Sequence, residues 1–356
     1  MLKLRRGSVV AGEPLTVEVA GERRPAWADP ALVGECREGD EVLVNTEALD
    51  LGLGSGGFDI VCANLTRRVD SGGSGEAHVM KLNYSPIQHS VDPVEVQHTG
   101  DGPELARRLP VLVLPLHGHL APASWAFAQA DPGGSLGYVQ TPGGALPGTL
   151  SRDVALLRER GLIRGHVTAG PCYGGEHEAI SVPGALCAAA EGLGWDAVVA
   201  GPGPGILGSA SRYGHGGIAA LDVAHAALAL GLPTLVSPRL SASDPRERHR
   251  GLSHHSASVL ELLLGTVRVP VPETDAGGWP TDAPEGGSAP DALAAIAEAC
   301  GDRHDVAVEP VDLDGYAGAG LPTRTMGREL ADDPLFFAAP LAAGRALARA
   351  AIGVTR

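Results

Sequence analysis

The pattern of hydrophobic and polar residues changes character about 100 residues into the chain. Before that point, short runs that alternate apolar and polar side chains are separated by glycine-rich turns, which is typical of half-exposed β-strands. No helical period is recognisable there. Residues 1–100 are therefore predicted to form a small all-β barrel or sandwich domain, which ends in a turn-rich acidic stretch at Val91–Pro103. The runs are Leu15–Val19, Glu41–Asn45, Asp59–Ala63 and His78–Tyr84.

From about residue 104 to residue 356, continuous apolar runs alternate with segments of helical period. Apolar runs without alternation indicate strands buried on both faces, and their alternation with helices predicts a parallel sheet with crossover helices. The expected fold is α/β, a Rossmann-like, doubly wound and mostly parallel sheet behind the small N-terminal all-β domain. The predicted strands are Val111–Leu116, Leu136–Gln140, Ile163–Ala169, Ala197–Ala200, Thr234–Ser237, Thr266–Val271 and Val306–Val311. The predicted helices are Ala123–Ala130, Thr149–Arg160, Ala179–Gly192, Gly217–Leu230, His255–Leu264, Asp291–Ala299 and Leu341–Ala351.

Composition narrows the class of protein. The 356 residues carry a formal net charge of −15, which disfavours nucleic acid and anionic membrane surfaces as partners because both require clustered positive charge. We expect no membrane span, because we identify no stretch that approaches the roughly 18 apolar residues required. The first residues lack the apolar segment of a signal peptide. The five cysteines are scattered and show no C-x-x-C spacing, which favours a cytoplasmic protein without disulfides.

The candidate chemistry lies in the loops that follow the predicted strands, where open parallel sheets bind their ligands. The first of these loops contains His117 and His119. On an extended segment, two histidines separated by one residue point the same way, so both could ligate one metal ion or grip an anion. A pair used only for turn hydrogen bonds is the structural alternative. With His215 from a later loop, these residues are the predicted metal ligands.

Two further loops suggest different roles. Cys172 is predicted to lie in a turn near a helix N-terminus with His177 nearby, so it is a candidate nucleophile. The run Gly201–Gly208 follows a strand and offers glycines whose N–H groups could hold an anion. Pro204 removes one donor, so this loop matches a dinucleotide fingerprint poorly, and the P-loop pattern is absent. The predicted substrate-binding residues of this loop are Gly203, Gly205, Gly208 and Ser209.

The longest polar run follows the strand Thr234–Ser237 and ends in Arg248–His255. A solvated charged loop explains its arginines but not three histidines within seven residues. Ser253 is a plausible N-cap for the next helix. Because adjacent histidines face different directions on a helix, we expect at most one of the final two to join the other ligands. The predicted catalytic residues are His249, His254 and His255 together with Cys172, and the predicted anion holders are Arg246, Arg248 and Arg250.

Five segments together resemble an uncharacterised bacterial family that is found mainly in Actinobacteria and also in Firmicutes. They are Leu116–Pro122, Gly201–Gly208, Asp244–His255, Gly39–Asn45 and Leu51–Gly57. The family is known only as a domain of unknown function. The resemblance implies an intact bacterial cytosolic protein, and it transfers no activity, substrate or catalytic residue.

Two functions remain open at this point. The first is an enzyme that acts on a small anionic substrate, with metal-dependent hydrolysis on zinc, manganese or magnesium as its best-formed version. The second is a non-catalytic ligand-binding or regulatory module for a nucleotide or a phosphorylated metabolite. Either function would use a small anionic ligand, and the chain could form a homo-oligomer.

Overall fold

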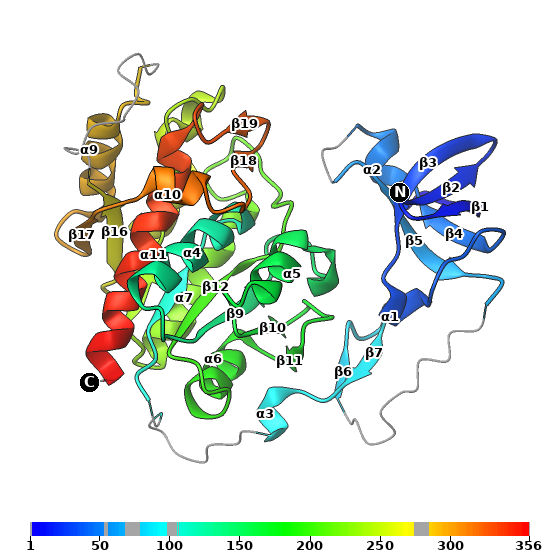
Figure 1. The fold of residues 1–356 in the computed structure, drawn as a ribbon, viewed down its shortest axis with the longest axis horizontal. Coiled ribbons are helices and arrows are strands. Elements are labelled where there is room, and N and C mark those ends of the chain that lie inside the picture. Colours follow the sequence, from blue (N-terminus) through cyan, green and yellow to red (C-terminus); the bar gives the residue numbers. More distant parts are fainter. Residues whose placement is uncertain are drawn as a thin grey trace. The chain divides into compact units, whose positions relative to one another are not determined.

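In a computed structural model of the chain, residues 2–52, 56–67, 79–97, 105, 107–273 and 285–355 are described. The chain divides into two compact units, Met1–Asp92 and Pro93–Arg356. The dividing point lies inside the stretch Val91–Pro103, of which residues 98–103 are outside the described ranges. Figure 1 follows the elements of both units along the chain.

The first unit contains a closed five-stranded barrel in the order β1-β2-β3-β5-β4. Alternate residues of its strands, such as Val42 and Val44, point inward and are fully buried. Valines suit such a pleated, half-buried surface. The strands are β1 (Leu4–Gly12), β2 (Leu15–Val19), β3 (Glu22–Trp27), β4 (Glu41–Asn45) and β5 (Asp59–Asn64), and a separate hairpin is made of β6 (Val79–Lys81) and β7 (His89–Val91).

Two differences from the predicted barrel domain have simple physical reasons. The strands β1 and β3 were not predicted, because exposed arginines interrupt the apolar alternation in both. Two single-turn helices, α1 (Pro30–Val33) and α2 (Glu47–Asp50), are also present, although no helix was expected. Four residues are too few to display a helical period. The predicted strand start at residue 78 lies outside the described residues.

The second unit is built on an eight-stranded parallel sheet in the order β11-β10-β9-β12-β8-β13-β16-β17. The prediction of an α/β fold with a doubly wound parallel sheet and a small N-terminal β domain is confirmed. The strands are β8 (Val111–Val113), β9 (Leu136–Thr141), β10 (Gly165–Ala169), β11 (His177–Ala179), β12 (Ala197–Pro202), β13 (Thr234–Val236), β16 (Arg268–Pro272) and β17 (Asp305–Glu309).

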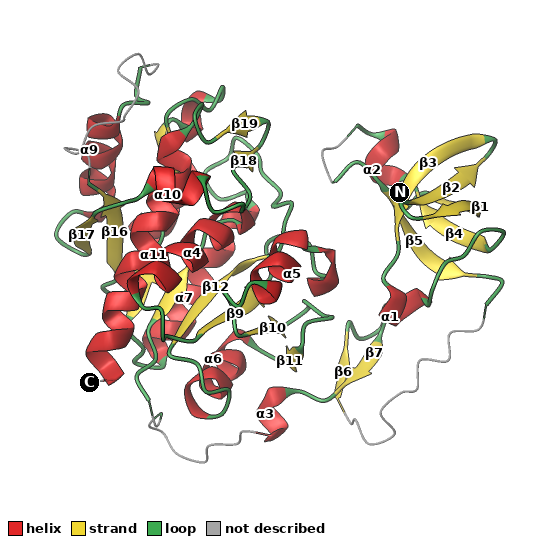
Figure 2. Cartoon of the chain, viewed as in Figure 1, coloured by secondary structure: helices red, strands yellow, loops and turns green. Residues whose placement is uncertain are grey.

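Helices cover both faces of this sheet (Figure 2). On each face, an apolar core lies between the sheet and the helices. Successive residues of a strand face opposite sides, so Val111 and Val113 belong to one core and Leu112 to the other. The first core contains residues of α6 (Val182–Glu191), α7 (Ala219–Ala229), α8 (His254–Leu262) and α9 (Ala289–Cys300). The second contains residues of α4 (Leu120–Ala130), α5 (Arg152–Glu159), α10 (Leu313–Ala317) and most of α11 (Pro334–Thr355). The remaining helix is α3 (Val94–Gln97).

Helix α11 corrects the expectation that no stretch is long and apolar enough to cross a membrane. Within the described ranges it alone passes that test, over Pro334–Val354 with a mean hydropathy of 1.4. Inside this unit, 78% of the residues in the segment are buried. Phe336, Leu341 and Leu347 pack in the second of the two apolar cores. Its apolar composition is therefore explained by its position in the core of an α/β fold.

The order of the strands brings three loops to one place. The chain starts in the centre of the sheet at β8, winds outward to β11, returns through β12 and continues on the other side from β13. The strands β12, β8 and β13 are therefore adjacent, and their carboxyl ends meet where the direction of winding changes. Ligands of open α/β sheets bind at this kind of switch point.

Short elements shape these loops. The 3₁₀ turns are η1 (His117–His119), η2 (Gly148–Leu150), η3 (Gly216–Ile218) and η4 (Glu247–His249), and two small antiparallel ladders are formed by β14 (Leu240–Ser241) with β15 (Gly251–Leu252) and by β18 (Arg324–Thr325) with β19 (Arg328–Glu329).

Candidate functional site

Four histidine rings gather beside the switch point. His215 lies in the loop after β12, His249 ends the turn η4, and His254 and His255 begin helix α8. The rings of His215 and His255 stack with centroids 3.8 Å apart, and the ring of His254 lies 4.4 Å from that of His255. His249 completes the group at 4.9 Å from His254.

Three of these residues form a ligand-like group. His215, His254 and His255 each offer one ring nitrogen, and the three atoms lie within 4.8 Å of one another. The sequence-based prediction placed at most one of His254 and His255 in a ligand set with His117 and His119, but both belong to this group. It considered the helix alone, whereas the His215 ring stacks on His255 and also lies 5.4 Å from His254.

The hydrogen bonds of these rings leave a nitrogen of each ring without a partner. The Nε2 atom of His215 is 3.0 Å from the Arg212 carbonyl, and the Nδ1 atom of His254 is 3.3 Å from the Arg248 carbonyl. A carbonyl only accepts, so these nitrogens donate. The lone pairs then sit on Nδ1 of His215 and Nε2 of His254, and both atoms are buried without a partner, as are both nitrogens of His255.

Burial also sets the protonation state of the rings. It lowers the pKa of His215 and His254 below the usual value, and it lowers that of His255 to about 2 and that of His249 to about 3. Desolvation disfavours the charged imidazolium, and the positive charge of Arg239 acts in the same direction. The four rings are therefore neutral at physiological pH, which is the form that ligates metal ions.

His117 and His119 do not join this group. The extended geometry expected for them is wrong, because residues 117–119 form a 3₁₀ turn and the two rings diverge. His117 bonds Ser151 Oγ through Nε2 at 2.7 Å, whereas His119 contacts Ser237 Oγ through Nδ1 at 3.0 Å. Within the described residues, the ligand-like group combines His215 with His254 and His255 instead.

Cys172 is not placed where the helix-dipole argument needs it. It is fully buried, and the strand β11 separates it from the following helix. That helix begins at Val182 with Ser181 as its N-cap. The prediction of a thiol at a helix N-terminus is therefore wrong, and the physical reason for a reactive Cys172 is lost.

The glycine-rich loop after β12 forms one wall of an open pocket of about 430 Å³. Of the predicted loop residues, Gly205 lines this pocket, and His215 is part of the same wall. The pocket residues are Gly143, Gly144, Gly205, Leu207, Gly214, His215 and Gly216.

The other predicted glycine-loop residues serve the shape of the loop. Gly208 forms a β-bridge with His215, and a Cβ there would lie 3.8 Å from the His255 ring. Gly203 packs against the backbone at Ala145, where a side chain would collide. The hydroxyl of Ser209 bonds the Gly214 carbonyl at 2.8 Å and so closes the turn.

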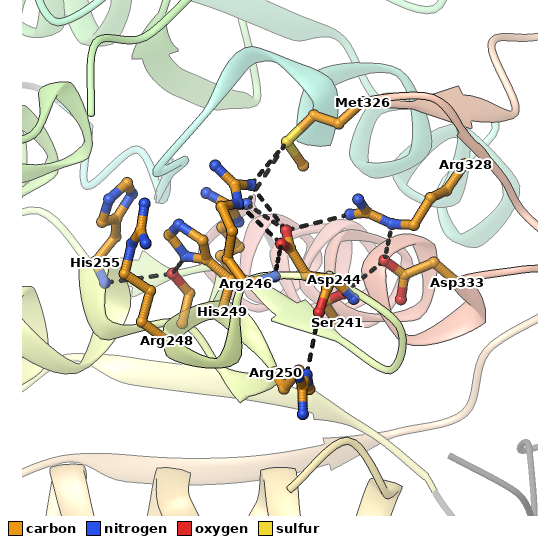
Figure 3. Close-up of polar contacts among 12 residues, drawn as sticks. Ser241, Asp244, Arg246, Arg248, His249, Arg250, His255, Met326, Arg328 and Asp333 are labelled. Carbon is orange, nitrogen blue, oxygen red and sulfur yellow. Dashed lines mark hydrogen bonds and ion pairs between the residues drawn. The ribbon is translucent and has the colours of Figure 1, made fainter. Parts of the chain in front are cut away.

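A network of arginines around Asp244 adjoins the histidines (Figure 3). The buried Asp244 carboxylate accepts hydrogen bonds from Arg246 through Nε and Nη2, both at 2.9 Å. Arg239 and Arg328 reach the same carboxylate at 3.2 and 3.4 Å. Burial alone would raise the pKa of Asp244, but its bonds with Arg246 and the surrounding charges hold that pKa well below the usual range.

The predicted anion holders thus differ in their contacts. Arg246 is paired with Asp244, and Arg250 donates to the Asp244 carbonyl at 3.2 Å. Arg248 is exposed, and its carbonyl anchors His254. Arg239 was not among the predicted binders, although its position three residues after β13 was a usable signal. Arg328 comes from a distant segment, and nothing local in the sequence pointed to it.

Comparison with known proteins identifies the family. Residues 25–344 match the family described as "Protein of unknown function (DUF3866)". The chain belongs to this family, as its motifs suggested. The chain matches no curated protein and no solved structure.

Proposed function

We propose that this member of the DUF3866 family is a metal-dependent enzyme that hydrolyses a small anionic substrate. The observation that carries the proposal is the group of His215, His254 and His255, whose ligand atoms lie within 4.8 Å of one another. Each ring is neutral and has a buried nitrogen without a hydrogen-bond partner. Buried polar atoms are normally satisfied, and a neutral imidazole carries one lone pair, so the three rings direct three unpartnered lone pairs into one place, which favours a cation ligated by all three.

The donor set favours zinc among the divalent metals. Imidazole nitrogens suit Zn²⁺, whereas Mg²⁺ and Mn²⁺ prefer oxygen ligands. In a tetrahedral site with Zn–N bonds near 2.05 Å, ligand nitrogens lie about 3.3 Å apart. The largest separation here would have to shrink by about 1.5 Å. Neither nitrogen of His255 is hydrogen-bonded, so a turn of this ring toward the other two would break no hydrogen bond of its own.

The remaining parts of the site fit this assignment. Three protein ligands leave one position for water or substrate, which is the usual composition of catalytic zinc sites. A divalent ion held there would polarise a substrate oxygen and acidify a water molecule. His215 belongs both to the ligand group and to the wall of the glycine-lined pocket. We assign the part of the substrate that reacts at the metal ion to that pocket.

His249 takes a supporting role in this proposal. Its Nδ1 atom lies 2.7 Å from Ser253 Oγ, the hydroxyl that also caps helix α8. A ring whose pKa is about 3 is a weak base at neutral pH. His249 therefore positions the start of the helix, and with it His254 and His255, rather than transferring protons.

We also propose a cytoplasmic location. No two of the five cysteines, all of which lie in the described ranges, form a disulfide. Thiols spread through both units suit a reducing compartment.

The test is metal content combined with variants. We expect about one equivalent of zinc per chain in elemental analysis after purification without added metal. His254→Ala should lower the content to the background, whereas His225→Gln should not, because His225 lies on α7 and is not one of the three grouped histidines. A zinc content that is the same in both variants would refute the assignment. Metal-dependent hydrolysis of model esters would then separate an enzyme from a ligand-binding module.

A further inference from the structure

Two guanidinium groups converge on one point beside the histidines. Nη2 of Arg239 and Nη2 of Arg246 both contact Oδ2 of Asp244, at 3.2 and 2.9 Å. The same two nitrogen atoms each lie 3.6 Å from Sδ of Met326. Figure 3 shows the Met326 sulfur joined by dashed lines to guanidinium nitrogens that also reach Asp244.

Met326 is a poor partner for these donors. A thioether sulfur is only a weak acceptor, so it adds little to the hydrogen bonds that Arg239 and Arg246 make with Asp244. Arg239 is 3% exposed, and its Nε atom is buried without any partner. A buried guanidinium with an unused donor is costly unless an anion completes its bonds.

The local charges do not cancel. Three guanidinium groups, those of Arg239, Arg246 and Arg328, share two carboxylates, Asp244 and Asp333. These five groups therefore carry one surplus positive charge, and the repulsion among the cations acts most strongly on Arg239, whose side chain is only 4% exposed. A bound oxyanion would neutralise the surplus charge.

The turn that carries Met326 is built so that the sulfur can be displaced. Thr325 pairs with Arg328, so Met326 and Gly327 form a two-residue hairpin turn. Met326 has a φ of 44°, a left-handed conformation that disfavours its side chain. It is also 50% exposed. The sulfur thus covers the guanidinium groups from solvent without being packed in a core.

The backbone places this point next to the ligand histidines. The ladder of β14 and β15 pairs Leu240 with Leu252, and the Ser253 N–H donates to the Arg239 carbonyl at 2.9 Å. Arg239 is therefore opposite the residue that precedes His254. A group bound at the arginines would lie beside the start of helix α8.

We propose that Arg239 and Arg246 bind the phosphoryl group of the substrate, and that the Met326 sulfur occupies the place of an oxyanion oxygen until substrate displaces it. This assignment names the substrate class of the proposed function, on which it rests for the reaction but not for the binding. Two arginines suit a phosphoryl group, which has several terminal oxygens. A carboxylate has only two oxygens, and a single guanidinium group can bind both of them.

Calorimetric titration of inorganic phosphate into the metal-free full chain tests the proposal. We expect phosphate to bind at least about tenfold more tightly than acetate at equal ionic strength, because it can engage both arginines. Arg246→Gln should weaken phosphate binding about tenfold or more. Arg324→Gln also removes one positive charge, from the hairpin that carries Met326, but Arg324 is exposed and pairs with the exposed Glu329, so this substitution should have less than about a twofold effect. Met326→Gly, which relaxes the turn and removes the sulfur, should tighten binding about threefold.

Other outcomes of these titrations would overturn one part of the proposal or the other. Equal loss in Arg246→Gln and Arg324→Gln, or equal binding of phosphate and acetate, would overturn the phosphoryl site. Unchanged affinity in Met326→Gly would overturn the role of the sulfur. His254→Ala separates the two proposals, because it should abolish zinc content and leave phosphate binding of the metal-free chain intact. Failure of one measurement therefore does not imply failure of the other.

Discussion

Replacing Asp244 by asparagine should strongly destabilise the protein. The substitution keeps the size of the side chain but removes the charge that three guanidinium groups share. The amide retains one acceptor oxygen, so Arg239 or Arg246 loses its carboxylate oxygen. Where the amide nitrogen takes the place of Oδ2, the buried Arg239 loses its hydrogen bond to residue 244 and is left with the weak Met326 contact.

The magnitude follows from the exposure of each partner. The Arg246 side chain is 41% exposed, so its pairing contributes at most about 1 kcal/mol. The Arg239 side chain is 4% exposed, and breaking a buried pair on one side costs about 3–5 kcal/mol. We expect the free energy of unfolding to fall by about 3 kcal/mol, which corresponds to roughly 6–12 °C in melting temperature for a unit of this size.

Urea unfolding followed by circular dichroism measures this change, with Asp302→Asn as the matched control. Asp302 is exposed, and an exposed substitution should change stability by less than about 0.5 kcal/mol. The folded-state pKa of Asp244 lies below its ordinary 3.8, so its contribution is present above pH 3.8 and is lost as the pH falls below that value. The difference between wild type and Asp244→Asn should therefore narrow in acid. A loss no larger than that of the control, or a difference independent of pH, would refute the reasoning.

Three further predictions concern other parts of the second unit. Burial lowers the pKa of His166 from the ordinary 6.5 to about 3. As the pH falls from 6.5 towards 3, the unfolded chain binds a proton at this residue before the folded chain does. The wild type should therefore lose about 1.4 kcal/mol of stability per pH unit through His166 in this range. His166→Gln should show a shallower decline in pH-dependent urea unfolding, and an identical decline would contradict the assignment. Gly217→Val should reduce zinc affinity at least about tenfold in competition with a chelator, because even a Cβ there would lie 3.3 Å from Nδ1 of both His215 and His255; unchanged affinity would argue against the ligand set. Phe336→Ala should cost about 3–5 kcal/mol in urea unfolding, since the ring is fully buried and meets the His119 ring edge-on at 5.1 Å; a cost below about 1 kcal/mol would show that the core closes around the gap.

Much of the fold was determined by local patterns. The spacing of apolar residues predicts strands such as Leu15–Val19 and helices such as α4, because each of these elements must bury one face. The alternation of apolar runs with helices predicted the parallel sheet, and the loops after β8, β12 and β13 were correctly singled out as polar. Short or charged elements were not predicted: β1 and β3 carry exposed arginines, and α1 spans one turn.

What only the tertiary structure decided is which polar residues meet. Strand order places His215 against His254 and His255. It leaves His117 and His119 apart from them, each in contact with a serine hydroxyl. Arg328 and Met326 reach Asp244 and its arginines across 80 or more positions of sequence. A periodic pattern reports which face of an element is buried, because that depends on neighbours within a few residues. It holds no information on distant partners, whose meeting depends on how the whole sheet is ordered.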